Sequence, residues 1–206
     1  MNAVAETSAL YYWTGVGSRR TDRSRAPVMT RFAQAMALQG AFMRSGAAPG
    51  PDTWFEDGTP VHQKRIYVPD DEFRQWAKRR REEVVIPKEV DLLLWLRACS
   101  IAEELHPLGR RMSADVRGLM GRNVFQVLGD DLKTPSKFLV CDAPLPVFDA
   151  EGRVVDVDGG TGMAVRLAAR YQVPVFHMSI PAHLQRIEAF ANAKLGPAPT
   201  SSLRYP

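Results

Sequence analysis

The chain has 206 residues, of which 45% are hydrophobic and 24% are charged, proportions that are ordinary for a soluble globular protein. No apolar run approaches the length of a membrane span, so we expect no membrane association. The formal net charge of +4 and the pI of about 9.3 favour anionic partners but do not establish nucleic-acid binding.

The two cysteines, Cys99 and Cys141, lie in different apolar runs without Cys or His companions at metal-ligand spacing. This is typical of reduced, buried thiols in a cytoplasmic protein, and we expect no metal site. Residues 1–10 lack a basic stretch followed by an apolar core, so no secretory signal is predicted. The length favours one domain over residues 1–206, with a core at about 10–195, a helical insertion at about 70–122 and a tail at 196–206.

The first third of the chain alternates strands and helices. The predicted elements are a strand at 10–16, a helix begun by Pro27 and stopped at Gly40, a strand at 41–44, a short helix at 53–58 begun by Asp52, and a strand at 65–69. The order β-α-β-α-β predicts a parallel sheet with right-handed crossovers.

Residues 70–87 have a different character. The basic run Lys78–Arg81 is interpreted as a solvated helix face or insertion in preference to a nucleic-acid patch. A long helix with a wide apolar face follows at 90–105, and Ser113 caps a further helix that carries Val116, Leu119 and Met120 into the segment 121–129.

The remaining chain predicts a buried strand at 136–141, a β-hairpin at 147–155, a glycine-rich loop at 158–162 that opens a helix, a strand at 173–178 and a last helix at 182–194. The predicted fold class is therefore α/β: a Rossmann-like open, mostly parallel sheet with helices on both faces and a small β-hairpin excursion.

Three glycine-bearing loops, at 15–18, 46–50 and 159–162, follow predicted parallel strands and should gather at the carboxyl edge of the sheet. The third loop aims the free N–H groups and positive dipole of a helix at one spot, where the Thr161 hydroxyl can also bind phosphate. The alternative is that the glycines only make tight turns and that nearby arginines pair with carboxylates. The joint pattern favours an anionic, nucleotide-like ligand, contacted by Gly15, Gly17, Ser18, Arg19, Arg44, Ser45, Gly46, Gly50, Asp52, Gly159, Gly160, Thr161 and Gly162.

These motifs resemble the SLOG superfamily of Rossmann-like nucleotide-binding proteins, in particular the phage and bacterial branch similar to DNA-processing protein A (DprA), a recombination mediator. The resemblance spans residues 11–180, and its motif order is more specific than any single motif. It implies that Arg122 and Asn123 also contact the ligand. The matching segments are Gly15-Val16-Gly17-Ser18-Arg19, Arg44-Ser45-Gly46-Ala47-Ala48-Pro49-Gly50-Pro51-Asp52, Phe55-Glu56-x-Gly58, Arg122-Asn123-x-x-Gln126, Gly159-Gly160-Thr161-Gly162 and Val173-Pro174-Val175.

The sequence departs from a second branch, the phosphoribohydrolases that carry Pro-Gly-Gly-x-Gly-Thr-x-x-Glu. Asp158 replaces the proline, the Gly and Thr order differs, and Arg166 lies near the position of the catalytic glutamate. These differences weigh against a hydrolase. Pro51, where relatives favour alanine, stiffens the second loop.

Among single residues, Glu56 is a candidate for acid/base work or a ribose contact, and equally for a surface ion pair with Arg44 or Arg19. Asp52 is predicted to be a helix N-cap. His177, inside an apolar strand, is predicted to be a core histidine, and no Ser–His–Asp or metal cluster can be argued.

The leading hypothesis is a protein that binds a nucleotide or nucleotide-derived ligand at the carboxyl edge of the sheet. The second is a DNA-binding, recombination-mediator-like protein that binds single-stranded DNA through Lys78–Arg81 and other basic positions. The third is a nucleotide N-glycosidic hydrolase or transferase that uses Glu56. The identity of the ligand, the occurrence of catalysis and a homo-oligomeric state are left open by the sequence.

Overall fold

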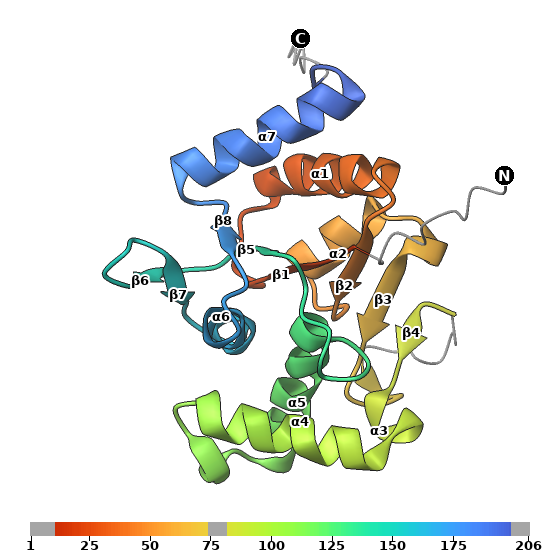
Figure 1. Ribbon diagram of the computed structural model, residues 1–206, viewed down its shortest axis with the longest axis vertical. Helices are drawn as coiled ribbons and strands as arrows, with labels where there is room; N and C mark the ends of the chain where they lie inside the picture. The colour runs from red at the N-terminus through yellow and green to blue at the C-terminus, as the bar shows by residue number, and fades with distance from the viewer. Residues whose placement is uncertain (1–10, 74–81, 199–206) are drawn as a thin grey trace, which may run out of the picture.

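The computed structural model describes residues 11–73 and 82–198. Six parallel strands form one sheet in the order β4-β3-β2-β1-β5-β8, and β6 and β7 form a separate antiparallel hairpin (Figure 1). The strands are β1 Tyr12–Gly17, β2 Phe42–Ser45, β3 Lys64–Tyr67, β4 Val84–Val85, β5 Leu139–Asp142, β6 Val147–Phe148, β7 Val154–Asp156 and β8 Val175–His177. The α-helices are α1 Ala26–Leu38, α2 Pro51–Asp57, α3 Pro87–Val90, α4 Leu92–Leu105, α5 Ala114–Leu128, α6 Thr161–Arg170 and α7 Pro181–Leu195.

The sheet changes direction of growth at β1. From β1 the chain adds β2, β3 and β4 on one side, then returns to place β5 and β8 on the other. Gly17 of β1 lies in register with Asp142 of β5, so the two strands end together. In an open α/β sheet this switch point is where ligands bind, at the carboxyl ends of the strands.

Helices cover both faces of the sheet, which explains why its central strands are apolar on both sides. Figure 1 shows α1, α2 and α7 on one face and α4, α5 and α6 on the other. Trp13 packs edge-on against Phe32 and Phe55 in the first layer, whereas Phe125 packs against Tyr67 and Trp95 in the second. Each face therefore has its own aromatic core.

The predicted fold class is confirmed, including the hairpin excursion β6–β7. The strand β4, which pairs with β3 at the edge of the sheet, was not predicted, because the segment 70–87 was interpreted as an insertion. The glycine loop at 159–162 follows β7 of the hairpin, so the prediction that it follows a strand of the main sheet is wrong. The basic run Lys78–Arg81 lies outside the described residues.

Two local predictions need correction. The helix begun by Ser113 does not end before residue 121 but runs on to Leu128, so that Arg122 and Asn123 are helical. The N-cap of α2 is Gly50, at φ +93°, and Asp52 lies inside the first turn. Within the described ranges, no helix is long and apolar enough to cross a membrane. Both cysteines are buried and unpaired with one another.

Candidate phosphate-binding pocket

A cavity of about 390 Å³ lies at the carboxyl end of β1, over the switch point of the sheet. Three segments that are distant in the chain meet there: the turn after β1, the middle of α5 and the start of α6. The lining residues are Val16, Gly17, Ser18, Arg19, Arg20, Ala48, Pro49, Asp52, Phe73, Leu119, Met120, Arg122, Asn123, Gln126, Gly159, Gly160 and Thr161.

The first wall is the turn that follows β1. Gly17 approaches Pro51 so closely that a Cβ atom there would lie 2.4 Å from the Pro51 Cγ. Its N–H donates to the Asp52 carboxylate (3.1 Å), and the next N–H, of Ser18, donates to the Asp142 carbonyl (2.9 Å). The Ser18 hydroxyl accepts from the Arg20 N–H (3.1 Å). This turn is thereby fixed in the shape that presents Arg19 and Arg20 at the pocket.

The opposite wall is the N-terminus of α6. Gly159 takes the left-handed conformation, at φ +81°, and turns the chain into the helix. The side-chain amide of Asn123 donates to the Gly160 carbonyl (3.1 Å), which ties this loop to α5. The first N–H groups of an α-helix have no intrahelical partners, and with the helix dipole they favour an anion such as phosphate. In α6 the Gly162 N–H already donates to the Gly159 carbonyl (3.1 Å).

The floor of the pocket is made by polar side chains of α5. Arg122 is 5% exposed, and its guanidinium lies 3.8 Å from the Asp52 carboxylate and 5.4 Å from the Phe73 ring centroid. With its amide oxygen turned toward Gly46, Gln126 accepts from the Gly46 N–H (2.9 Å). A side chain at Gly46 would displace the Arg122 guanidinium, because a Cβ atom there would lie 1.3 Å from its Nη1.

Asp52 joins two loops of the site to helix α5. Its carboxylate accepts from the N–H groups of Gly17 (3.1 Å) and Ala48 (3.2 Å) and faces Arg122. Burial raises the pKa of Asp52 to about 6, although Arg122 and these N–H groups act in the opposite direction. Asp52 is therefore a structural link between loops that also borders the pocket.

One ion pair joins the two walls at the mouth of the pocket. Arg20, in the turn after β1, bonds to Asp158, the residue before the glycine loop. Both side chains are largely exposed, at 63% and 46%. The Arg20 bond is the largest cause that lowers the pKa of Asp158, so this carboxylate is ionised at neutral pH.

No protein-family model matches this chain, and no curated protein matches it. A solved structure of DNA processing protein A from Helicobacter pylori is similar to it, with a TM-score of 0.53 and 16% sequence identity over 89% of this chain and 79% of that one. This chain has a DprA-like Rossmann fold. The work on the H. pylori protein describes a single-stranded DNA binding mode of DNA processing protein A.

The structure brings together only part of the set of ligand contacts predicted from the sequence. Nine of these line the pocket and two lie in its supporting frame. The residues that line the pocket are Gly17, Ser18, Arg19, Asp52, Arg122, Asn123, Gly159, Gly160 and Thr161, and Gly46 and Gly50 shape the loop beneath it.

Arg44 does not reach the pocket, contrary to the prediction. It is 3% exposed, donates to the Thr134 carbonyl (2.7 Å) and stacks 3.8 Å from the centre of the Tyr12 ring. In β2 it pairs with Thr14 of β1, whose hydroxyl bonds the Gln126 carbonyl and Ser136. Arg44 thus stabilises the loop between α5 and β5.

Three other predicted contacts also have structural roles. The Ser45 hydroxyl donates to the Gly15 carbonyl (2.7 Å) between adjacent strands. Gly15 lies under Phe55, and Gly162 packs on the Val157 carbonyl, where a Cβ atom would lie 2.4 Å from it. None of these residues lines the pocket.

Glu56, the candidate catalytic carboxylate, lies in α2 away from the pocket. It is 9% exposed, and its carboxylate lies 3.6 Å from the Lys64 ammonium, which also donates to the Glu56 carbonyl (3.1 Å). Glu56 thus pairs with Lys64 instead of the predicted Arg44 or Arg19, and it does not line the pocket. Its acid/base role stays a prediction.

Several pocket residues were not predicted. Arg20 is one of them. It belongs to a cluster that is recognisable in the sequence as four arginines within seven residues and that we call the arginine turn: Arg19, Arg20, Arg23 and Arg25. Phe73, Leu119 and Met120 form an apolar wall. No sequence signal identifies these three, because they come from segments that the fold alone brings to β1.

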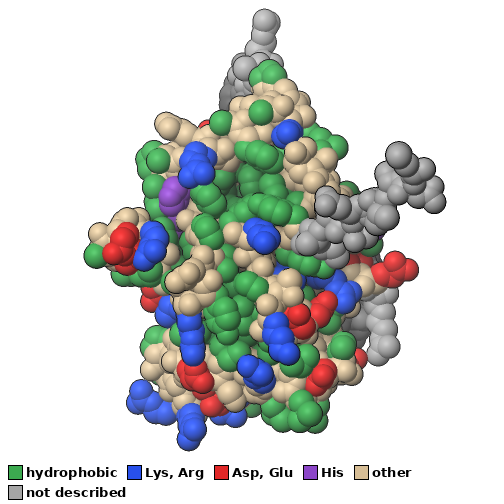
Figure 2. Space-filling view, viewed as in Figure 1, with side chains coloured by type: hydrophobic (Ala, Val, Ile, Leu, Met, Phe, Trp, Pro, Cys, Tyr) green, Lys and Arg blue, Asp and Glu red, His purple; other side chains and the backbone are tan. Residues whose placement is uncertain are grey.

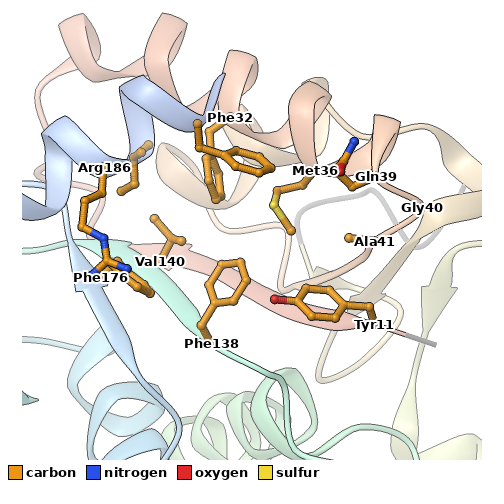
Figure 3. A pocket seen from close by; sticks show the side chains of 12 residues that line it. Tyr11, Phe32, Met36, Gln39, Gly40, Ala41, Phe138, Val140, Phe176 and Arg186 are labelled. Atoms are coloured by element: carbon orange, nitrogen blue, oxygen red, sulfur yellow. The ribbon is translucent and has the colours of Figure 1, made fainter. Parts of the chain in front are cut away.

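A second, larger cavity of about 730 Å³ lies at the amino edge of the sheet, between α1, α7 and the starts of β1 and β5. Figure 2 shows hydrophobic side chains gathered near the centre of the face of the molecule that is in view. Figure 3 shows Phe32 and Met36 facing Phe138 and Tyr11. Arg186 is the charged residue of its lining and lies over the Phe176 ring, 4.9 Å from its centre. This cavity lacks the polar loops of a phosphate site.

His177 is fully buried, as predicted for a core histidine, with Nε2 2.9 Å from the Ala143 carbonyl. In the part of the chain that the structure describes, no group of three His, Cys, Asp or Glu side chains is arranged to hold a metal ion.

Proposed function

We propose that this protein binds single-stranded DNA, with one phosphate group of the strand held in the pocket between the turn after β1 and the start of α6. The observation that carries the proposal is that one cavity combines phosphate-binding groups with an apolar wall. The phosphate-binding groups are the N-terminus of α6, Arg19 and Arg20. The apolar wall is formed by Phe73, Leu119 and Met120. Single-strand binding sites combine a basic groove with side chains on which bases stack.

The arginine turn supports a ligand longer than one nucleotide. Arg19, Arg20 and Arg23 are exposed and follow directly on the strand that ends at the pocket. Arg25 lies 3.8 Å from Asp142 at the end of β5, so the turn extends along the carboxyl edge of the sheet. A chain of phosphates bound in the pocket can therefore meet further cations beside it. The DprA-like fold supports the same proposal, since single-stranded DNA binding is described for the H. pylori protein.

A mononucleotide is the second candidate, supported by the cavity volume of about 390 Å³. This value falls within the range of small-ligand sites, roughly 300–1,000 Å³. The hydrolase hypothesis has no such support, because Glu56 is paired with Lys64 outside the pocket.

Fluorescence anisotropy with a labelled oligothymidylate tests the proposal. We expect binding that weakens with salt, with a slope of about −0.7 in log K against log salt for each phosphate neutralised. The variant Arg19→Ala should weaken binding and reduce the slope by about one such increment. Arg170→Ala, which removes an exposed arginine at the far end of α6, serves as the matched control and should change neither.

Two results would contradict the proposal. One is the absence of oligonucleotide binding at low salt, and the other is equal weakening by Arg19→Ala and Arg170→Ala. Tight binding of thymidine 5′-monophosphate without binding of the oligonucleotide would favour the second candidate.

A further inference from the structure

Asp158 places a negative charge at the entrance of a pocket built for phosphate. It precedes the left-handed Gly159, and its carboxylate pairs with Arg20, which lines the pocket. The Asp158 backbone N–H donates to the Pro144 carbonyl (2.9 Å), so the residue is fixed on the wall formed by the start of α6. A phosphate group bound by that helix terminus would lie beside the Asp158 carboxylate and would share Arg20 with it.

The charge of the incoming phosphate group then decides how strongly it is repelled. A phosphodiester inside a DNA strand carries one negative charge, whereas a terminal phosphate monoester carries about −1.5 to −2 at neutral pH. Arg19 and Arg20 both line the pocket and can compensate charge on the ligand, but Asp158 already takes part of the compensation that Arg20 offers. A second charge on the ligand would therefore face an ionised carboxylate.

We infer that Asp158 makes the pocket selective for the singly charged phosphodiester of a strand over the doubly charged phosphate of a mononucleotide or strand end. The inference rests on the proposed function, since it assumes that the pocket binds phosphate. It assigns a specificity role to the residue at which this sequence departs from the proline of the phosphoribohydrolase motif.

The test uses two ligands that differ in this one charge: thymidine 5′-monophosphate and its methyl ester. Dissociation constants are measured at pH 8, by competition against labelled oligothymidylate, for the wild type and for Asp158→Asn. Because Arg19 and the helix terminus attract both ligands, the quantity compared is the preference, the ratio of the two dissociation constants. Asp158→Asn should shift this preference toward the monophosphate by roughly fivefold, the effect of one charge several ångströms away in a solvent-exposed site.

Glu104→Gln is the matched control, because it also removes a carboxylate from an exposed arginine pair, 2.7 Å from Arg170 at the far end of α6. The control should keep the wild-type preference. Unchanged preference in Asp158→Asn, with oligothymidylate still bound, would overturn the inference and leave the proposed function intact. Failure of the wild type to bind oligothymidylate and both thymidine ligands would overturn the proposed function and the inference together.

Discussion

Gly17→Ala tests whether the turn after β1 is as closely packed as the structure indicates. A Cβ atom at residue 17 would lie 2.4 and 2.6 Å from two ring atoms of Pro51 and 2.7 Å from the Asp142 carbonyl oxygen. Ordinary contacts between carbon atoms are about 3.5–4.0 Å, so these neighbours would have to move by about 1 Å. A proline ring and a strand carbonyl are rigid and cannot rotate away.

The expected cost follows from what holds these neighbours in place. Moving Gly17 weakens its hydrogen bond to Asp52 (3.1 Å), and moving the Asp142 carbonyl weakens its bond from Ser18 (2.9 Å). Overpacking of a dense site costs about 1–3 kcal/mol, and we expect about 3 kcal/mol here because the obstacles are rigid. For a chain of this size the melting temperature should fall by about 6–12 °C.

Gly160→Ala is the matched control for thermal unfolding followed by circular dichroism. Gly160 has φ −63°, in the α-helical region, and the nearest atom to an added Cβ is the Met120 Cε at 3.7 Å. This variant should melt at or slightly above the wild-type temperature, because alanine restricts the unfolded chain. If Gly17→Ala melted with the wild type, the close approach of β1 to Pro51 would be refuted, and with it the geometry of the first wall.

Three further predictions concern single residues. Arg44→Met should lower the free energy of unfolding, measured in urea, by about 2–3 kcal/mol through the lost hydrogen bond to Thr134, and it should leave the affinity for oligothymidylate unchanged. Loss of affinity in a folded variant would show that Arg44 takes part in binding. Phe73→Ala should weaken oligothymidylate binding by about 1–3 kcal/mol with an unchanged salt slope, the pattern of a lost stacking contact, and a changed slope would contradict it. Burial lowers the pKa of His177, so the folded protein holds it neutral while the unfolded chain protonates below about pH 6.5. The free energy of unfolding should therefore be highest above that pH and fall on acidification, and it should fall less steeply with pH in His177→Gln. An equal dependence on pH in the wild type and the variant would contradict this.

The order of strands and helices could be predicted because each element carries its own periodic pattern. The edge strand β4 could not, since it has only Val84 and Val85 and is defined by pairing with β3. The end of α5 was misplaced because Gly121 was interpreted as leaving the helix. In the structure this glycine allows a close helix contact, since a Cβ atom there would lie 2.8 Å from the Cys99 sulfur on α4. The sequence alone does not distinguish a glycine that permits close packing from one that ends a helix.

The candidate site could be predicted in position but only partly in composition. The loops at 15–18 and 46–50 follow strands of the main sheet, so their place at the carboxyl edge follows from the fold class. The loop at 159–162 follows the β6–β7 hairpin instead, so the fold class alone does not place it beside the other two. The arginines depend on which face of a strand or turn they occupy. Arg19 and Arg44 each follow a strand pattern closely, yet Arg44 still belongs to β2 and its side chain is buried, whereas Arg19 lies beyond the end of β1 and is exposed. A difference of one or two residues in strand length separates a residue that lines the pocket from one that is buried in the fold.

Asp52 shows why a correct residue can receive the wrong role. Its type and its place before a short helix predict an N-cap, which would hold the helix's own N–H groups. In the structure Gly50 takes that position, and the Asp52 carboxylate instead accepts N–H groups of Gly17 and Ala48 while facing Arg122. The carboxylate thus closes the ring between the β1 turn, the second loop and α5. These contacts form only when the three segments meet in space, so no spacing along the chain could reveal them. The same contacts give the pocket its shape.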